Sequence, residues 1–146
     1  IRELIPHIDA EYRTLSAREG RALAGWSMGG DAALRFVCKY PDSFCAAASM
    51  GAAIDWGEED SSEDTIFAHS RKNVEQLRGR TGLLLVVGEE DRLARAHERL
   101  KPHLEELKLE YEFRSYPGIG HNLGAIKEKC AEELVQMLSR NLAEAK

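Results

Sequence analysis

Short apolar segments alternate with amphipathic segments along most of this chain, and this alternation constrains the fold more than any other feature. Strands that alternate with helices predict βαβ units and a parallel sheet. A length of 146 residues suits a single domain. We therefore expect an α/β protein with three layers, with its chemistry in loops at the carboxyl ends of the strands. The expected strands are residues 21–25, 44–50, 81–87 and 111–116, and the expected helices are residues 3–15, 28–40, 92–107 and 122–142.

Two features depart from this regular pattern. Residues 51–80 are polar without clear periodicity, so we expect irregular structure there. The acidic run at residues 58–64 lacks the ligand order and central glycine of an EF-hand loop, so it predicts a solvated loop rather than a calcium site. Pro102 lies within the third expected helix and predicts a kink or a break.

The first expected strand runs into the sequence GWSMG, residues 25–29, which matches the G-x-S-x-G pattern of a nucleophile elbow. Such a serine has strained backbone, and its neighbours two residues away must be small so that strand and helix can approach. The pattern alone also fits a chance turn, but its place between a buried strand and a helix favours Ser27 as a nucleophile. The backbone N–H of Met28 is then the expected oxyanion donor.

The loop after the third expected strand offers three carboxylates, Glu89, Glu90 and Asp91. A serine nucleophile needs a base, and the base needs a carboxylate that fixes its tautomer. We favour Asp91, because it ends the loop just before a helix, with Glu90 as the next candidate. The alternative is that Asp91 only caps that helix, a role worth about 1 kcal/mol.

Among the five histidines, His121 alone lies in a glycine-flanked loop after the fourth expected strand. His97 and His103 lie on an expected surface helix. A lone histidine is more often structural than catalytic, but the order Ser27, Asp91, His121, each after its own strand, favours a triad. The sequence contains no HExxH and no CxxC motif, so we expect neither a metal nor a cofactor.

Two tryptophans are the expected substrate-binding residues. Trp26 is adjacent to Ser27, and Trp56 follows the second expected strand by a few residues. For Trp56, ordinary packing is an equally good interpretation.

Bulk properties exclude some partners. A net charge of −5 gives no reason to expect nucleic acid or an anionic membrane, and the longest apolar run, residues 83–87, is too short to span a bilayer. Cys38, Cys45 and Cys130 predict buried or half-buried free thiols, which fit a reducing compartment without requiring one. Because the chain starts at Ile1 rather than Met, we expect the natural N-terminus to lie upstream, and localisation stays open between cytoplasm and secretion.

With these motifs in hand, the chain resembles the putative esterase (esterase D-like) family of α/β-hydrolases. That family includes feruloyl and acetyl xylan esterases, S-formylglutathione hydrolases, enterochelin esterases and mycolyltransferases. The resemblance implies an α/β-hydrolase fold with Ser27 as nucleophile, Asp91 as acid and His121 as base. It rests on AGWSMGG at residues 24–30, YPDSF at 40–44, GEED at 88–91 and GHN at 120–122.

The front of the chain departs from the family pattern. Members have several strands before the elbow, including the loop that supplies a second oxyanion donor, whereas this chain has only the expected helix at residues 3–15. The resemblance therefore implies the C-terminal half of a domain, about four strands of eight. The strand at residues 21–25 would then expose an edge prone to pairing with another chain, which makes an oligomer one expectation. Losing one oxyanion donor costs about 10² to 10³ in turnover, so we expect the isolated chain to be weakly active or inactive.

The leading hypothesis is a serine carboxylic-ester hydrolase that works through an acyl-enzyme on a small-molecule or carbohydrate-linked ester. Acyl transfer to an alcohol on the same triad is a related outcome, and a serine peptidase is less favoured because the elbow resembles the esterase type. A non-catalytic binding protein that retains the fold is the alternative from another class.

Overall fold

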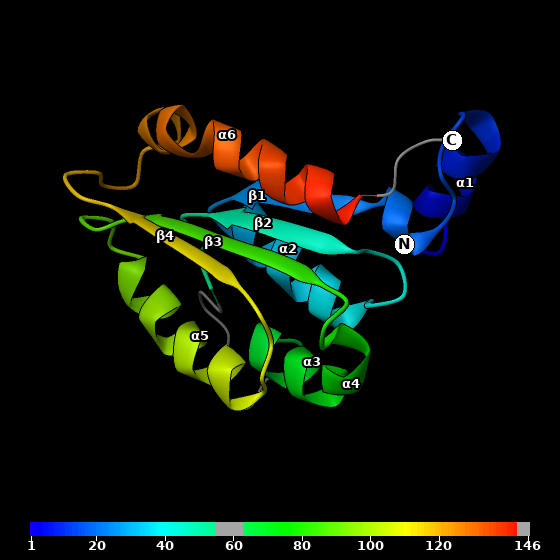
Figure 1. The fold of residues 1–146 in the computed structure, drawn as a ribbon, viewed down its shortest axis with the longest axis horizontal. Coiled ribbons are helices and arrows are strands. Elements are labelled where there is room, and N and C mark those ends of the chain that lie inside the picture. The colour runs from blue at the N-terminus through cyan, green and yellow to red at the C-terminus, as the bar shows by residue number, and fades with distance from the viewer. Residues whose placement is uncertain (55–62, 143–146) are drawn as a thin grey trace.

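The four expected strands form one parallel sheet in the computed structural model, which describes residues 1–54 and 63–142. The sheet follows chain order, β1-β2-β3-β4, and every neighbouring pair is parallel (Figure 1). The prediction of a parallel α/β sheet is confirmed. The strands are β1 (Ala22–Trp26), β2 (Ala46–Met50), β3 (Gly82–Gly88) and β4 (Glu112–Tyr116).

Helices cover both faces of the sheet and give the three expected layers (Figure 1). One face is covered by α6 (Leu123–Asn141) and the other by α2 (Met28–Lys39) and α5 (Ala94–Glu106). All five residues of β2 are buried, because this strand lies between two others and under helices on both sides. Its alanines therefore pack as closely as the leucines and valines of β3.

The sheet separates two apolar cores. The larger core lies on the α2 and α5 face, and the smaller core lies under α6. Burial of this apolar surface is the main favourable term for folding. Fully buried members of the larger core include Leu34, Val37, Leu85, Leu100 and Leu104, and those of the smaller core include Leu84, Val86, Ile126, Cys130 and Met137.

Part of the segment expected to be irregular is helical. It contains α3 (Ile66–Lys72) and α4 (Val74–Leu77), which the sequence pattern did not reveal. Helices of seven and four residues are too short to display a helical period. Their support is local and tertiary: the Thr65 side chain accepts a hydrogen bond from the Ala68 N–H at 3.1 Å, and Ile66 and Leu77 are buried.

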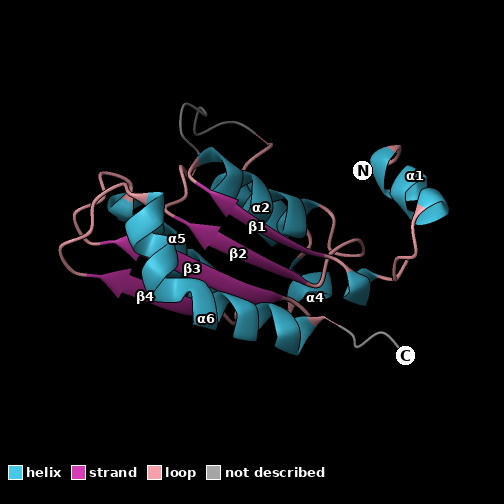
Figure 2. Ribbon diagram, turned by 90° about the horizontal axis from the view of Figure 1, so that it is seen from above, coloured by secondary structure: helices cyan, strands magenta, loops and turns pink. Residues whose placement is uncertain are grey.

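Two helices differ in detail from expectation. α5 continues through Pro102, although the proline cannot donate a hydrogen bond within the helix. Buried leucines on both sides of this position hold the helix against the sheet. α1 (Leu4–Glu11) is shorter than the expected helix and contains no buried residue. It projects away from the sheet (Figure 2), with Ile5 partly buried against the larger core and Asp9 paired with Arg21.

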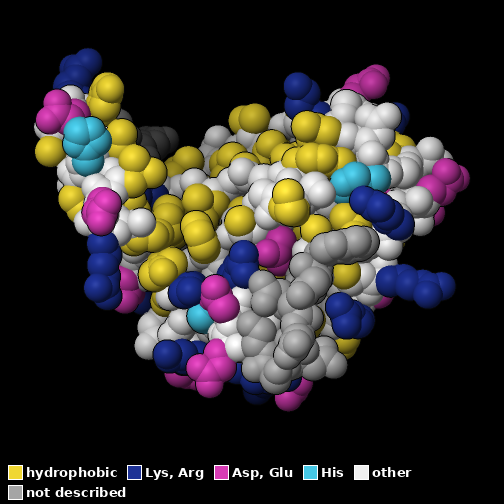
Figure 3. Space-filling view, turned by 180° about the vertical axis from the view of Figure 1, so that it is seen from behind, with side chains coloured by type: hydrophobic (Ala, Val, Ile, Leu, Met, Phe, Trp, Pro, Cys, Tyr) yellow, Lys and Arg dark blue, Asp and Glu magenta, His cyan; other side chains and the backbone are white. Residues whose placement is uncertain are grey.

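The outer edge of β1 is open. β1 pairs with β2 on one side, and within the described ranges no strand pairs with its other side. Hydrophobic side chains gather on the face beside the projecting α1 (Figure 3). Leu4, Tyr12 and Leu15 of this region are exposed. In the part of the chain that the structure describes, none of the helices combines the length and the apolar character needed to cross a bilayer.

Candidate active site

Ser27 occupies a strained turn between β1 and α2. Its backbone angles are φ 56° and ψ −118°, a region that residues other than glycine rarely adopt. Hydrogen bonds on both sides hold the turn: the Ser27 N–H donates to the Met50 carbonyl at 3.0 Å, and the Ser27 carbonyl accepts from Gly30, Asp31 and Ala53. Strain of this kind persists only where the surrounding structure enforces it.

The two glycines that flank Ser27 have different reasons to be small. A Cβ added at Gly25 would lie 2.0 Å from the carbonyl oxygen of Gly29, so the expected steric need is confirmed there. A Cβ added at Gly29 would meet no atom of the described residues within 4 Å. The expectation of a tight contact is therefore wrong for Gly29, which lies on the exposed side of the first turn of α2.

Three side chains from separate loops form a continuous hydrogen-bonded row. His121 Nε2 lies 3.1 Å from Ser27 Oγ, and His121 Nδ1 lies 2.8 Å from Asp91 Oδ2. A neutral imidazole with its proton on Nδ1 donates to the carboxylate and accepts from the serine hydroxyl. The Asp91 side chain is fully buried, whereas that of His121 is part-exposed. The structure thus brings together the three residues predicted from chain order.

The Asp91 carboxylate contacts His121 but does not cap α5, whose N-cap position is Leu93 and has no side-chain cap hydrogen bond. Its Oδ2 contacts His121, and its Oδ1 accepts a hydrogen bond from the Leu93 N–H at 2.9 Å, in the turn that leads into α5. The interpretation of Asp91 as the cap of this helix is therefore wrong, and its carboxylate instead joins the turn before α5 to the imidazole. The competing Glu90 is exposed, and Glu89, also exposed, accepts a hydrogen bond from the Ser115 hydroxyl at 3.1 Å.

Backbone hydrogen bonds hold the acid loop and the histidine loop together. The Glu89 N–H donates to the Tyr116 carbonyl and the Glu90 N–H donates to the Ile119 carbonyl, both at 3.0 Å. Gly88 permits this approach, since a Cβ there would lie 2.0 Å from the Ile119 oxygen. The two loops thereby keep a fixed register beyond the ends of β3 and β4.

Met28 is the first residue of α2, so its backbone N–H has no acceptor within the helix. Met28 directly follows Ser27 in the chain, and the residue is 76% exposed.

The two predicted substrate-binding tryptophans have different outcomes. The Trp26 indole stacks on the His121 imidazole, with ring centroids 4.5 Å apart and planes inclined by 30°. Trp56 lies outside the described residues.

Gly51 is a residue of the site that sequence reasoning missed. It follows β2 with φ +50°, and a Cβ there would lie 2.7 Å from Trp26 Cζ3 and 3.2 Å from Asp91 Oδ2. The sequence feature that could have identified Gly51 is a glycine directly at the carboxyl end of a buried strand.

His97 and His103 are not on an exposed helix face as expected. They are 0% and 6% exposed, because α5 turns this side toward the sheet and α3. His97 Nδ1 lies 3.1 Å from the Leu93 carbonyl, and His103 Nε2 lies 2.7 Å from the Ser70 hydroxyl. Burial lowers the pKa of both imidazoles, so both are neutral core residues at neutral pH.

Only the end of the acidic run lies within the described residues. Asp64 forms ion pairs with Lys39 and His69, both at 2.6 Å, and these hydrogen bonds lower the pKa of its carboxyl to about 2. This end is therefore tied to α2 and α3, while Glu63 and Asp64 are both exposed, as expected of a solvated segment. Residues 58–62 of the run lie outside the described residues. The described ranges contain no group of three or more His, Cys, Asp or Glu side chains arranged to hold a metal ion.

The prediction of free thiols is confirmed. Cys38, Cys45 and Cys130 are all free and buried. Burial raises the pKa of the Cys38 thiol to about 12.

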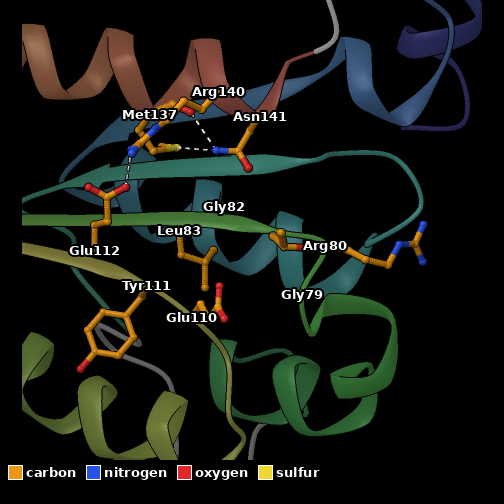
Figure 4. A pocket seen from close by; sticks show the side chains of 11 residues that line it. Gly79, Arg80, Gly82, Leu83, Glu110, Tyr111, Glu112, Met137, Arg140 and Asn141 are labelled. Atoms are coloured by element: carbon orange, nitrogen blue, oxygen red, sulfur yellow. Dashed lines mark hydrogen bonds and ion pairs between the residues drawn. The ribbon is translucent and has the colours of Figure 1, made fainter.

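A cavity of about 450 Å³ lies at the amino ends of β3 and β4, beside the end of α6 (Figure 4). Arg140 and Glu112, which both line this cavity, form an ion pair with each other. Ser27 and His121 follow the carboxyl ends of their strands, so this cavity lies at the other end of the sheet.

Comparisons with known proteins agree with this architecture. Over residues 1–141 the sequence matches the family described as "Putative esterase". A 49-residue segment, 34% of this chain, is 47% identical to Esterase Rv1288 of Mycobacterium tuberculosis and covers 11% of that protein.

Solved structures share the fold at low sequence identity. S-formylglutathione hydrolase FrmB of Staphylococcus aureus is similar with a TM-score of 0.77 and 20% identity, over 94% of this chain and 58% of its own. A ferulic acid esterase is similar with a TM-score of 0.83 and 22% identity, over 97% of this chain and 59% of its own. The chain thus spans less than two thirds of these relatives. By its fold and by a match that covers nearly its whole length, it belongs to the putative esterase family of α/β-hydrolases.

Proposed function

We propose that this chain carries the catalytic half of a serine carboxylic-ester hydrolase, with Ser27, His121 and Asp91 as its triad. The observation that carries the proposal is the hydrogen-bonded row from Asp91 Oδ2 through both nitrogens of His121 to Ser27 Oγ. The strained turn at Ser27 and membership of an esterase family support the same reading.

In the proposed reaction, Ser27 Oγ attacks the acyl carbonyl carbon while His121 Nε2 takes the hydroxyl proton. Asp91 stabilises the imidazolium, and the Met28 N–H donates to the oxyanion. When the tetrahedral intermediate collapses, the C–O bond to the alcohol breaks and Nε2 gives its proton to the leaving oxygen. A water molecule then attacks the acyl-enzyme with His121 as base, and the carboxylic acid is released.

We also propose that residues 1–146 form part of one larger hydrolase domain whose further strands pair with the open edge of β1. The support is the open edge, the exposed apolar side chains beside it, and a chain that spans 58% and 59% of two solved relatives. Those strands would bring the second oxyanion donor. We expect the 146-residue chain alone to be slower by about 10² to 10³ than the complete protein.

The proposed substrate class is a small-molecule or carbohydrate-linked ester, because the hydrogen-bonded row of Asp91, His121 and Ser27 provides one nucleophile that can attack an acyl carbonyl. A panel of p-nitrophenyl esters, feruloyl esters and acylated glutathione, applied to the full-length protein, distinguishes the members of that class. Added alcohols that divert the acyl group from water would indicate acyl transfer on the same triad.

The test of the triad is the burst phase of p-nitrophenyl acetate hydrolysis by the full-length protein. We expect a burst of about one equivalent of p-nitrophenol per active site, since p-nitrophenol leaves during acylation and hydrolysis of the acyl-enzyme is the expected slower step. Ser27→Ala should abolish the burst, and Asp91→Asn should lower turnover by about 10⁴ because the imidazole takes the wrong tautomer. Glu90→Gln is the matched control, since this neighbouring carboxylate is exposed, and it should leave turnover unchanged. A full-length protein without ester turnover would favour the non-catalytic binding reading.

A further inference from the structure

The face of the His121 ring is supported by Trp26. The last residue of β1, Trp26 directs its indole to the α6 side of the sheet, where it packs against the smaller core. His121 follows β4 on the loop that leads into α6. The two rings meet with centroids 4.5 Å apart and planes inclined by 30°.

The two hydrogen bonds of His121 restrain one motion of the imidazole only weakly, namely a tilt of the ring out of its plane. Both bonds of His121, to Asp91 and to Ser27, are made through its ring nitrogens, whose hydrogen and lone pair lie in the plane of the ring. They fix where its nitrogens lie but oppose tilting about the line between those nitrogens only weakly. A flat side chain packed against the ring face blocks that tilt.

The histidine loop is tied to the acid loop by a backbone hydrogen bond at Ile119 and contains two glycines close to His121. Gly118 has φ +71° and Gly120 precedes the histidine directly, so two glycines give the loop conformational freedom. The Glu90 N–H donates to the Ile119 carbonyl and the Asn122 N–H donates to the Gly120 carbonyl, and these hydrogen bonds anchor the loop.

Gly51 has no side chain, and this leaves room for the Trp26 indole. The six-membered part of the Trp26 ring lies so close to Gly51 that a Cβ there would approach Cζ3 to 2.7 Å and Cη2 to 2.9 Å. The same Cβ would lie 3.2 Å from the Asp91 carboxylate. Gly51 thus lets the indole and the carboxylate come close to one another around His121.

We infer that Trp26 is a positioning residue for His121 rather than a wall of the substrate pocket. Its ring face holds the imidazole flat between Ser27 and Asp91 and favours the charged form that arises when His121 takes the serine proton. An aromatic face attracts a cation through its quadrupole, and this attraction exists only while the imidazolium does. The inference rests on the proposed function, because it concerns the base of the same triad.

The test is steady-state hydrolysis of p-nitrophenyl acetate by full-length Trp26→Leu, Trp26→Phe and wild-type protein. We expect Trp26→Leu to lower kcat by about three- to thirty-fold with KM unchanged, since the contact strengthens in the transition state. Trp26→Phe keeps a ring face and should recover most of that loss. Tyr111→Leu, the matched aromatic replacement at the amino end of β4, should leave kcat and KM as in the wild type.

The outcomes separate the two proposals. An unchanged kcat in Trp26→Leu, or a raised KM alone, overturns the positioning role, and the raised KM would indicate a pocket wall. A wild-type protein without turnover overturns the proposed function and with it any part for Trp26 in the reaction. The His121 ring protons provide a readout independent of activity: they should resonate upfield in NMR spectra of the wild type and of Trp26→Phe, and return downfield in Trp26→Leu. Ring protons that do not move would overturn the stacking.

Discussion

Replacing Gly25 with alanine tests how closely β1 and α2 must approach for Ser27 to hold its turn. The added Cβ would start 2.0 Å from the Gly29 carbonyl oxygen, whereas real Cβ contacts are not found below 3.0 Å. Strand and helix would therefore have to separate by about 1 Å at the point where both join Ser27. The contact is backbone, so no side-chain rotation can relieve it.

The expected cost follows from two opposing terms. Overpacking of this kind destabilises by about 1–3 kcal/mol. Replacing glycine also reduces the freedom of the unfolded chain, which returns about 0.4–1 kcal/mol. We expect Gly25→Ala to lower the free energy of unfolding by about 1–2 kcal/mol. The rate of reaction with a fluorophosphonate should fall by more, about 10²-fold, because a displacement of 1 Å misaligns the reacting groups.

Gly29→Ala is the matched control four residues along the chain. Its Cβ meets open space among the described residues, and alanine is favoured over glycine in a helix by up to about 1 kcal/mol. Urea unfolding of the full-length protein, followed by circular dichroism, should show equal or higher stability for Gly29→Ala and lower stability for Gly25→Ala. Equal midpoints for the two variants would refute the steric account of the elbow.

Three further outcomes follow from the structure. Gly51→Ala should lower stability by about 1–3 kcal/mol and slow fluorophosphonate labelling, since it combines a positive φ with a Cβ 2.7 Å from Trp26; wild-type behaviour would contradict the crowding described around this glycine. Because burial holds the pKa of His97 and His103 below the usual histidine value of about 6.5, the unfolded chain takes up protons first as pH falls. Stability should therefore be full above pH 6.5 and decline below it, and His103→Gln should flatten urea midpoints measured between pH 7.5 and 5.5, whereas an unchanged slope would assign the decline to other groups. The Cys38 thiol, with its pKa near 12, should resist iodoacetamide at pH 8 in the folded chain and react after unfolding in urea; equal rates in the two states would contradict its burial.

Much of the fold could be predicted from the sequence because β1, β2 and β3 are short apolar runs and β4 alternates between polar and apolar residues. A glycine or a proline also stands within one residue of the end of each strand. The order Ser27, Asp91, His121 was predictable for the same reason, since parallel strands deliver their following loops to one edge of the sheet. The elbow adds a local steric signature at Gly25, which is confirmed by the 2.0 Å approach to the Gly29 oxygen.

Features that depend on tertiary contacts were not predictable. The period of a helix cannot appear in α4, which has four residues and is held by burial of Leu77. The burial of His97 and His103 depends on which side of α5 packs against α3. From sequence alone, polar side chains at helical spacing predict an exposed helix face. The stack of Trp26 on His121 joins residues 95 positions apart, and no local pattern records it.

The most direct test of the central proposal is to locate the adduct that a fluorophosphonate leaves on the full-length protein. Mass spectrometry of the labelled and digested protein should find one phosphonyl group per chain, on Ser27, and none after Ser27→Ala. His121→Gln should slow labelling strongly while leaving the fold intact, because the serine loses its base. An unlabelled wild-type protein, or an adduct on another residue that persists in Ser27→Ala, would contradict the assignment of Ser27 as the nucleophile.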